Sequence, residues 1–151
     1  GPAALADDLP AFGLSYDQLV AVCAAYRARH GIALAAPTRA QWRLAAGTDT
    51  AYSWGPGNDL DTVRAHAVTW DTLEGTVGPR RVGDRRATAT GIHDLHGNVW
   101  EWCAPGTLLC GGSWADSIAV ARADTPLAHA GGGTDAGSAH GLFGARLVLT
   151  P

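Results

Sequence analysis

The chain has 151 residues, a length typical of one domain with a sizeable hydrophobic core. Its net charge is −3, and its eleven basic residues are arginines without a basic run, so we expect no nucleic-acid partner. No apolar stretch reaches the ~20 residues of a membrane span. We expect one domain over residues 3–151, which can form the C-terminal part of a longer chain. Gly1-Pro2 resembles the remnant of a protease site.

The first predicted helix begins at Ser15 and stops at Gly31. Ser15 with Gln18 three residues later matches a capping box, and glycine is the usual residue just beyond a helix end. Four apolar residues have the i, i+3, i+4, i+7 spacing of one helix face. This expected buried face consists of Leu19, Val22, Cys23 and Tyr26.

The second predicted helix begins at Thr38 and stops at Gly47. Gln41 completes another capping box, and the helix is so short that tertiary packing must hold it, with Trp42 as the anchor. The following stretch, 48–90, has poor periodicity and is expected to be irregular. A run of this length inside a compact domain is usually functional or tied by a metal.

Three strands are predicted in the second half, over 99–103, 108–114 and 145–149, with a second long irregular stretch over 115–144. Glycines inside the middle strand indicate a bulge or a close backbone approach. Three cysteines are too few for a disulfide framework. Cys23 is expected in the core, whereas Cys103 and Cys110 flank a turn, and the strand register decides whether they can bond.

Five motifs, in order, resemble those of the formylglycine-generating enzyme, or sulfatase-modifying factor, family. They are PTRAQW at 37–42, YSWG at 52–55, GIHDLHGNVWEW at 91–102, GGSW at 111–114 and GARLV at 144–148. The resemblance implies an α+β, C-type-lectin-like fold. In that fold, two helices pack on short antiparallel strands joined by long irregular loops.

The resemblance leaves several functions open, because fold alone does not settle function. The family includes a copper-dependent oxidase, domains of sulfoxide synthases and the variable proteins of diversity-generating retroelements. The oxidase needs a cysteine pair soon after GGSW, and residues 115–151 contain no cysteine. We therefore expect a non-enzymatic protein without a catalytic cofactor. The alternatives are an oxidase or accessory domain that uses another metal site, for instance one with His93, His96 and Glu101, or a structural module.

A structural calcium ion is a further implication of the resemblance. The corresponding family site uses two carboxylates and two main-chain carbonyls, which suit a hard cation. Its positions here are Asp94, Gly97, Val99 and Glu101. In the alternative interpretation, Asp94 caps a turn and Glu101 pairs with an arginine such as Arg146 or Arg122.

The 115–144 stretch is the candidate binding region. It is rich in small and polar residues and lacks Lys, Glu, Gln, Met and Trp. This composition fits adenine-directed diversification and also an ordinary loop; in variable proteins the diversified residues lie between the motifs that match GGSW and GARLV. The expected surface comprises Ala115, Asp116, Ser117, Ile118, Val120, Asp124, His129, Thr134, Asp135, Ser138, His140 and Leu142. Its ligand is unidentified, and we expect a protein or another cell-surface molecule.

Overall fold

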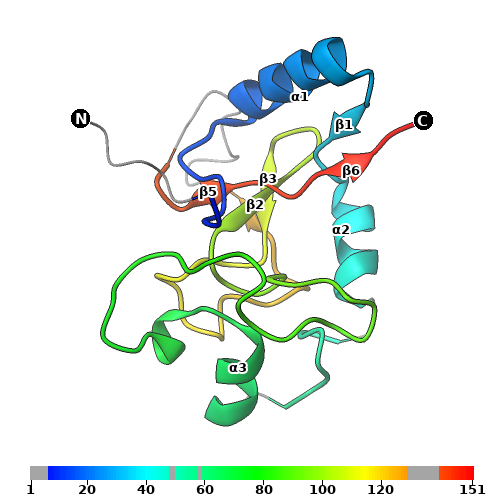
Figure 1. Ribbon diagram of the computed structural model, residues 1–151. Coiled ribbons are helices and arrows are strands. Elements are labelled where there is room, and N and C mark those ends of the chain that lie inside the picture. The colour runs from blue at the N-terminus through cyan, green and yellow to red at the C-terminus, as the bar shows by residue number, and fades with distance from the viewer. Residues whose placement is uncertain (1–6, 48–49, 58, 129–139) are drawn as a thin grey trace.

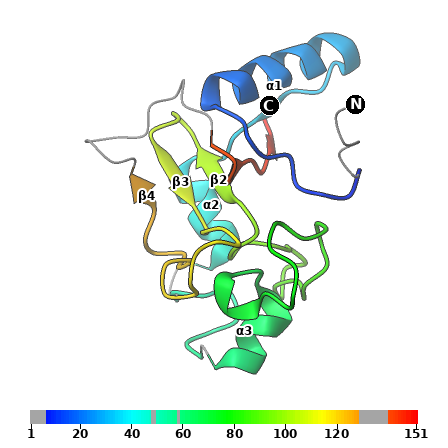
Figure 2. The same ribbon diagram turned by 90° about the vertical axis from the view of Figure 1, so that its left-hand side faces the viewer.

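The structure is a computed structural model that describes residues 7–47, 50–57, 59–128 and 140–151. Figures 1 and 2 show α1 and α3 at opposite ends of the molecule, with the strands and α2 between them. The helical elements are α1 (Tyr16–His30), α2 (Arg39–Ala46), α3 (Leu60–His66) and the 3-10 turn η1 (Trp70–Thr72). The strands are β1 (Leu34–Ala35), β2 (Trp100–Cys103), β3 (Leu108–Cys110), β4 (Leu127–Ala128), β5 (Phe143–Gly144) and β6 (Val148–Leu149).

Helix α1 has the predicted ends but only part of the predicted buried face. The capping box is confirmed: the Gln18 N–H donates to Ser15 Oγ over 3.1 Å, and the Ser15 N–H donates to Gln18 Oε1 over 2.9 Å. Leu19 and Cys23 are buried. Two members of the expected face, Val22 and Tyr26, are 53% and 39% exposed, so their assignment to the core was wrong. Apolar residues occur on several sides of this helix, and spacing alone did not identify the side that meets the sheet.

Helix α2 forms as predicted and is held by its tryptophan. The Gln41 N–H donates to Thr38 Oγ1, which completes the expected capping box with the reciprocal bond. The Trp42 side chain is fully buried, and its indole N–H donates to Glu101 Oε2 over 2.6 Å. This bond joins the two-turn helix to the central strand β2, and a helix of this length depends on such tertiary contacts.

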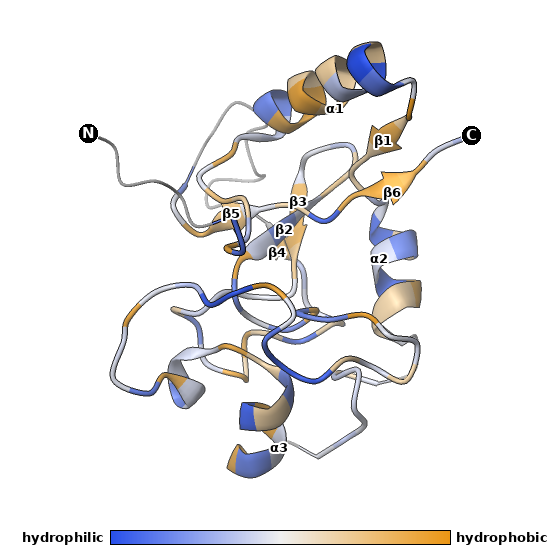
Figure 3. Cartoon of the chain, in the orientation of Figure 1, coloured by the Kyte–Doolittle hydropathy of each residue, from blue (hydrophilic) through white to orange (hydrophobic). Residues whose placement is uncertain are grey.

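The strands form two sheets. The larger has the order β4-β3-β2-β5, and the smaller pairs β1 with β6 antiparallel; Figure 3 shows both strands of this pair as apolar. The antiparallel expectation holds for β2–β3 and β3–β4, but β2 and β5 run parallel. The strands predicted over 108–114 and 145–149 are shorter than expected. The stretches predicted to be irregular contain α3, η1, β4 and β5.

Strand β2 separates two hydrophobic clusters. Because successive side chains of a strand point to opposite faces, Trp100 and Trp102 face one way and Glu101 and Cys103 the other. The two tryptophans pack in a cluster that includes residues of α1 and β5. The rings of Trp102 and Phe143 meet edge to face, with their centres 5.5 Å apart. Cys103 belongs to the second cluster, which is built around Trp42 of α2. One four-residue strand therefore supplies the inner wall of both clusters.

The two cysteines of the β2–β3 hairpin are diagonal neighbours. Cys103 lies opposite Leu108, and Cys110 lies opposite Glu101. The two buried thiols have their sulfur atoms 3.1 Å apart. The contact between the thiols raises the pKa of Cys103, and burial raises it further. The same contact lowers the pKa of Cys110. The register therefore permits close approach of the two thiols.

Across the part of the chain that the structure describes, none of the helices has the length and apolar character needed to cross a bilayer.

Candidate functional site

The loop of residues 115–124 follows the GGSW motif and folds back onto its glycines. Gly112 has a φ of 78°, a left-handed conformation that favours glycine. A Cβ atom at Gly112 would come within 2.6 Å of the Ala121 Cβ, so only glycine permits this approach. The loop is therefore seated directly against the end of β3. We call these residues the 115–124 loop.

The outer part of the 115–124 loop is fixed to the 3-10 turn η1. The Trp70 N–H donates to the Asp116 carbonyl over 2.8 Å, and the Ile118 N–H donates to Asp71 Oδ2 over 2.6 Å. Both bonds use main-chain atoms of the loop. The turn and the loop therefore form one continuous surface, although they are more than 40 residues apart in the sequence.

The inner part of the loop is fixed to two aromatic rings. The Tyr52 hydroxyl donates to the Ile118 carbonyl over 3.1 Å, and His96 Nδ1 donates to the Ala121 carbonyl over 2.7 Å. The Ala123 N–H donates to the carbonyl of Ala51 over 2.7 Å. Again the loop contributes main-chain atoms, so these contacts do not depend on the identity of its side chains.

His96 is a buried, neutral member of this framework. Because Nδ1 donates to a carbonyl, Nε2 accepts, and its donors are the Ser53 N–H at 3.0 Å and the Ser53 hydroxyl at 2.8 Å. Burial lowers the pKa of His96 to about 4. His93 instead bonds the carbonyl of Arg85 through Nδ1. His93 and His96 therefore do not converge on a common metal position.

The side chains of the loop differ in exposure. Ala115 is exposed, and Val120 is 44% exposed. Ser117 and Ile118 are half-buried. Asp116, which was expected on the binding surface, turns inward: its Oδ2 accepts from the N–H and the hydroxyl of Ser113. Asp116 is therefore a structural residue, because a carboxylate after a turn satisfies main-chain donors that would otherwise be unpaired.

Asp124 is exposed but engaged. It forms a two-bond fork with Arg122, with N–O distances of 2.8 and 2.6 Å. Hydrogen bonds from the Arg122 guanidinium lower the pKa of Asp124 to about 2. The guanidinium carbon also lies 5.9 Å from the centre of the Tyr52 ring. An incoming ligand would meet the pair as one unit, not as a free carboxylate.

The other expected surface residues lie elsewhere or outside the described residues. His140 and Leu142 precede β5, at the opposite edge of the larger sheet from β4. Leu142 is half-buried, and its side chain packs against the first hydrophobic cluster. His140 is exposed and its ring lies 5.1 Å from that of Phe143. Outside the described residues are His129, Thr134, Asp135 and Ser138.

Sequence reasoning missed Trp70, which lies beside the loop and is 60% exposed. Its main chain contacts Asp116, as described above. Large aromatic rings are usually buried in a monomer, and an exposed one beside a candidate surface is typical of an interaction site. The available signal was a tryptophan inside an irregular stretch, but nothing local distinguishes an exposed tryptophan from a buried one.

The expected calcium ligands are only partly oriented for a cation. Both oxygens of Glu101 accept from Arg146, at 2.8 and 3.0 Å, and one also accepts from Trp42. One oxygen of Asp94 accepts from the Gly83 N–H over 2.7 Å. Gly97 is held against Val68, where a Cβ would collide with the Val68 carbonyl oxygen. Asp94 and Glu101 thus have a main-chain N–H and an arginine as partners, as in the interpretation without calcium. Calcium binding stays a prediction.

The observed arrangement is an α+β, C-type-lectin-like fold of the formylglycine-generating-enzyme type, with an anchored loop after its GGSW motif. The sequence pattern of the sulfatase-modifying factor enzyme 1-like domain matches residues 2–151, and the chain belongs to this family. This result agrees with the resemblance of the five motifs.

Two sequence relatives are formylglycine-generating enzymes. The chain is 40% identical over 80 residues to the enzyme of Mycobacterium tuberculosis, a match that covers 44% of this chain and 25% of that protein. It is 39% identical over 80 residues to the enzyme of Thermomonospora curvata, a match that covers 45% of this chain and 26% of that protein. The chain thus matches about a quarter of the length of these curated relatives.

Two solved structures share the fold. Treponema denticola variable protein 1 superposes with a TM-score of 0.82 at 19% identity, over 100% of this chain and 75% of that one. PvdO from Pseudomonas aeruginosa superposes with a TM-score of 0.73 at 19% identity, over 97% of this chain and 64% of that one. At these identities the likeness shows a common fold and leaves function open.

Proposed function

We propose that this chain is a non-enzymatic ligand-binding domain of the kind encoded by diversity-generating retroelements. The binding surface would consist of the exposed side chains of the 115–124 loop together with Trp70. The likeness in fold to a variable protein and the lack of cysteine after GGSW both support this function. The ligand class is a protein or another cell-surface molecule.

One observation carries the proposal: the 115–124 loop is held mainly through its main chain. Asp71, Tyr52 and His96 bind main-chain atoms of Ile118 and Ala121. Side chains such as Val120 can then be replaced without loss of an anchoring bond. A rigid frame that presents replaceable side chains is the physical requirement for a recognition loop.

Trp70 supplies the binding energy that small loop residues lack. Recognition surfaces depend on a few large anchors, most often Trp, Tyr and Arg. The loop contributes a partly buried Ile118 and an exposed Val120, and its Asp116 carbonyl accepts from the main chain of Trp70. A fixed aromatic anchor flanked by variable small residues would combine affinity with adaptable specificity.

The nucleotide sequence around the gene tests the retroelement origin. We expect a near-copy of the 3′ end that differs from the gene only at adenines of the copy, next to a reverse transcriptase gene. The altered codons should include those of Ala115 and Val120 and should omit that of Asp116, whose side chain the fold uses. Absence of both the copy and the reverse transcriptase would refute this origin.

A display library tests the binding surface. Randomising Ala115, Ser117, Ile118 and Val120 should leave most clones folded, and selection against an immobilised protein such as lysozyme should yield binders. In a selected binder, Trp70→Ala should weaken the Kd by about tenfold or more, as expected for a central anchor. Replacing another exposed apolar residue, Leu44, is the matched control, because it lies on α2 and is 72% exposed. Equal effects of both replacements would contradict the assignment of Trp70.

A second candidate function follows from the sequence relatives. Two formylglycine-generating enzymes match this chain at 39–40% identity, which supports an oxidase or an accessory domain of one. The purified protein, supplied with copper and a thiol-containing peptide, would then consume molecular oxygen. We expect no copper-dependent oxygen uptake above that of free copper, and measured turnover would refute the binding proposal.

A further inference from the structure

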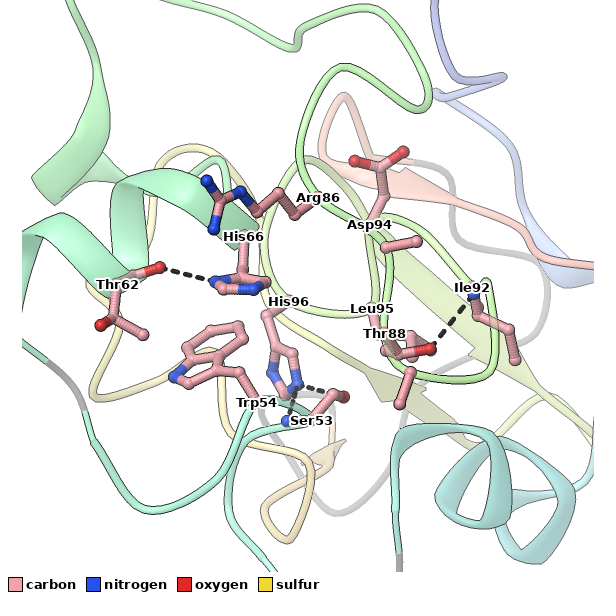
Figure 4. A pocket seen from close by; sticks show the side chains of 12 residues that line it. Ser53, Trp54, Thr62, His66, Arg86, Thr88, Ile92, Asp94, Leu95 and His96 are labelled. Atoms are coloured by element: carbon pink, nitrogen blue, oxygen red, sulfur yellow. Dashed lines mark hydrogen bonds between the residues drawn. The ribbon is translucent and has the colours of Figure 1, made fainter.

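A separate pocket lies between α3 and the segments 53–54 and 86–96. It has a volume of about 320 Å³ and is lined by residues from three parts of the chain. This volume is at the lower end of the range for small-molecule sites. Figure 4 shows His66, Trp54, Arg86 and Asp94 among the side chains that line the pocket. No residue of the 115–124 loop lines it, so the pocket is distinct from the surface discussed above.

One wall of the pocket is a fixed stack of aromatic rings. Trp54 stacks on Tyr52, with ring centres 5.1 Å apart and 7° between the ring planes. It also stacks on His66, with ring centres 5.2 Å apart and 24° between the planes. The Trp54 indole N–H donates to the Gly57 carbonyl over 2.7 Å. The apolar side chains of Ile92 and Leu95 also line the pocket. The aromatic and apolar side chains in the lining therefore suit a small apolar group.

Two polar groups at this pocket have no partner within the described residues. His66 Nδ1 donates to the Thr62 carbonyl over 2.9 Å, which leaves its Nε2 without a partner, and Figure 4 shows Nε2 toward the pocket centre. The Arg86 guanidinium forms no hydrogen bond or ion pair with the described residues, although its main-chain N–H is fixed to the Ala65 carbonyl of α3 over 2.8 Å. In Figure 4 the guanidinium lies on the same side as His66.

The acidic group of the pocket does not oppose these two. Asp94 lies on the opposite side from Arg86, and Figure 4 shows its carboxylate turned away from His66. One of its oxygens accepts from the Gly83 N–H. The side of the pocket next to His66 therefore carries the guanidinium of Arg86, and the carboxylate of Asp94 does not face it.

We propose that this pocket binds a small aromatic carboxylate. The ring would pack against the edge of the aromatic stack and against the side chains of Ile92 and Leu95. The carboxylate would accept from the Arg86 guanidinium, since a planar fork of donors matches a carboxylate with two hydrogen bonds. Neither family membership nor the proposed binding loop requires this site.

The test uses 2-naphthoate as the probe and the neutral 2-naphthamide as its matched partner. Isothermal titration should show saturable binding of 2-naphthoate to the full chain, at least tenfold tighter than that of the amide. Chemical-shift changes in heteronuclear NMR spectra should concentrate at Trp54 and residues 86–89. Arg86→Gln should weaken 2-naphthoate binding by about tenfold or more, the loss expected for a charge-assisted hydrogen bond.

Arg81→Gln is the matched control variant. Arg81 lies five residues before Arg86 in the sequence; its Nε lies 2.7 Å from Asp8 Oδ2, and it does not line the pocket. It should bind 2-naphthoate as the unmodified chain does. Because Arg86 is exposed and its side chain bonds no described residue, Arg86→Gln should also keep its melting temperature. Lack of saturable binding up to millimolar 2-naphthoate would overturn the proposal. Equal binding of acid and amide, or equal effects of the two variants, would do the same.

Discussion

The buried pair of Glu101 and Arg146 gives the most direct energetic prediction. The Glu101 side chain is 7% exposed, and the Arg146 side chain is 25% exposed. Burial lowers the pKa of Arg146, but the charge and hydrogen bonds of Glu101 outweigh this effect and raise it overall. Arg146→Met would leave the carboxylate with the Trp42 N–H as its remaining described hydrogen-bond donor. Removing one partner of a buried ion pair costs about 3–5 kcal/mol, and the partial exposure of Arg146 favours the lower end, about 3 kcal/mol.

Urea unfolding followed by tryptophan fluorescence at neutral pH measures this free energy. Glu101→Gln should cost about 2 kcal/mol, because the amide oxygen still accepts from Trp42. The double variant should cost at least about 1 kcal/mol less than the sum of the single variants, since it leaves no unpaired charge. The control is Arg81→Met, which breaks an exposed pair and should cost less than about 1 kcal/mol.

The same experiment separates the ion pair from calcium binding. If Arg146 is the cation that neutralises Glu101, a calcium chelator should leave the unfolding midpoint of the unmodified chain unchanged. If calcium binds Glu101 instead, added calcium should raise the unfolding midpoint, and Arg146→Met should hardly change the free energy of unfolding. An Arg146→Met variant no less stable than the Arg81→Met control would refute the reasoning.

Three further predictions concern other parts of the framework. Gly97→Ala should cost at least about 2 kcal/mol in urea unfolding, because φ is 79° and the new Cβ would collide with the Val68 carbonyl. Folding lowers the pKa of His96 from 6.5 to about 4, so protonation of His96 favours the unfolded chain. The free energy of unfolding that His96 contributes should therefore be complete above about pH 6.5 and lost as pH falls through about 4. The difference between these two pH values should be roughly 3 kcal/mol. Diamide, taking up two electrons and two protons, should join Cys103 and Cys110 in a disulfide that intact mass and alkylation detect.

Each of these predictions has a specific control. Gly91→Ala also places alanine at positive φ, but in open space, and should cost only about 1 kcal/mol. The stability of His96→Gln should vary less than that of the unmodified chain between about pH 4 and 6.5. Cys23 should remain free to alkylate after diamide treatment, because it lies on α1 and belongs to the other hydrophobic cluster. Equal costs at Gly91 and Gly97, an unchanged pH profile or a disulfide through Cys23 would each contradict the corresponding prediction.

Local signals predicted the helix ends well. Ser15 with Gln18 and Thr38 with Gln41 specify their capping boxes within four residues, and both boxes form. The seven-residue α3 was missed, because Asp59 caps it without the glutamate or glutamine of a capping box and two turns are too short to show periodicity. The sequence thus indicated elements whose determinants are local.

Features that depend on distant contacts were harder to predict. Asp116 turns inward because Ser113 presents two donors, whereas the exposed Trp70 is recognised only after η1 and the loop are seen together. The five family motifs predicted the fold, but they did not reveal the parallel pairing of β2 with β5. That pairing joins residues more than 40 positions apart, and no local pattern encodes it.

The position of β2 has a consequence for how the molecule unfolds. If the α1 side opened alone, Trp100 and Trp102 would be exposed to water; if the α2 side opened alone, Cys103 and Trp42 would be. Either opening exposes apolar side chains of the same four-residue strand to water and weakens the packing on its other face. We therefore expect the two sides of β2 to lose their packing together in urea unfolding.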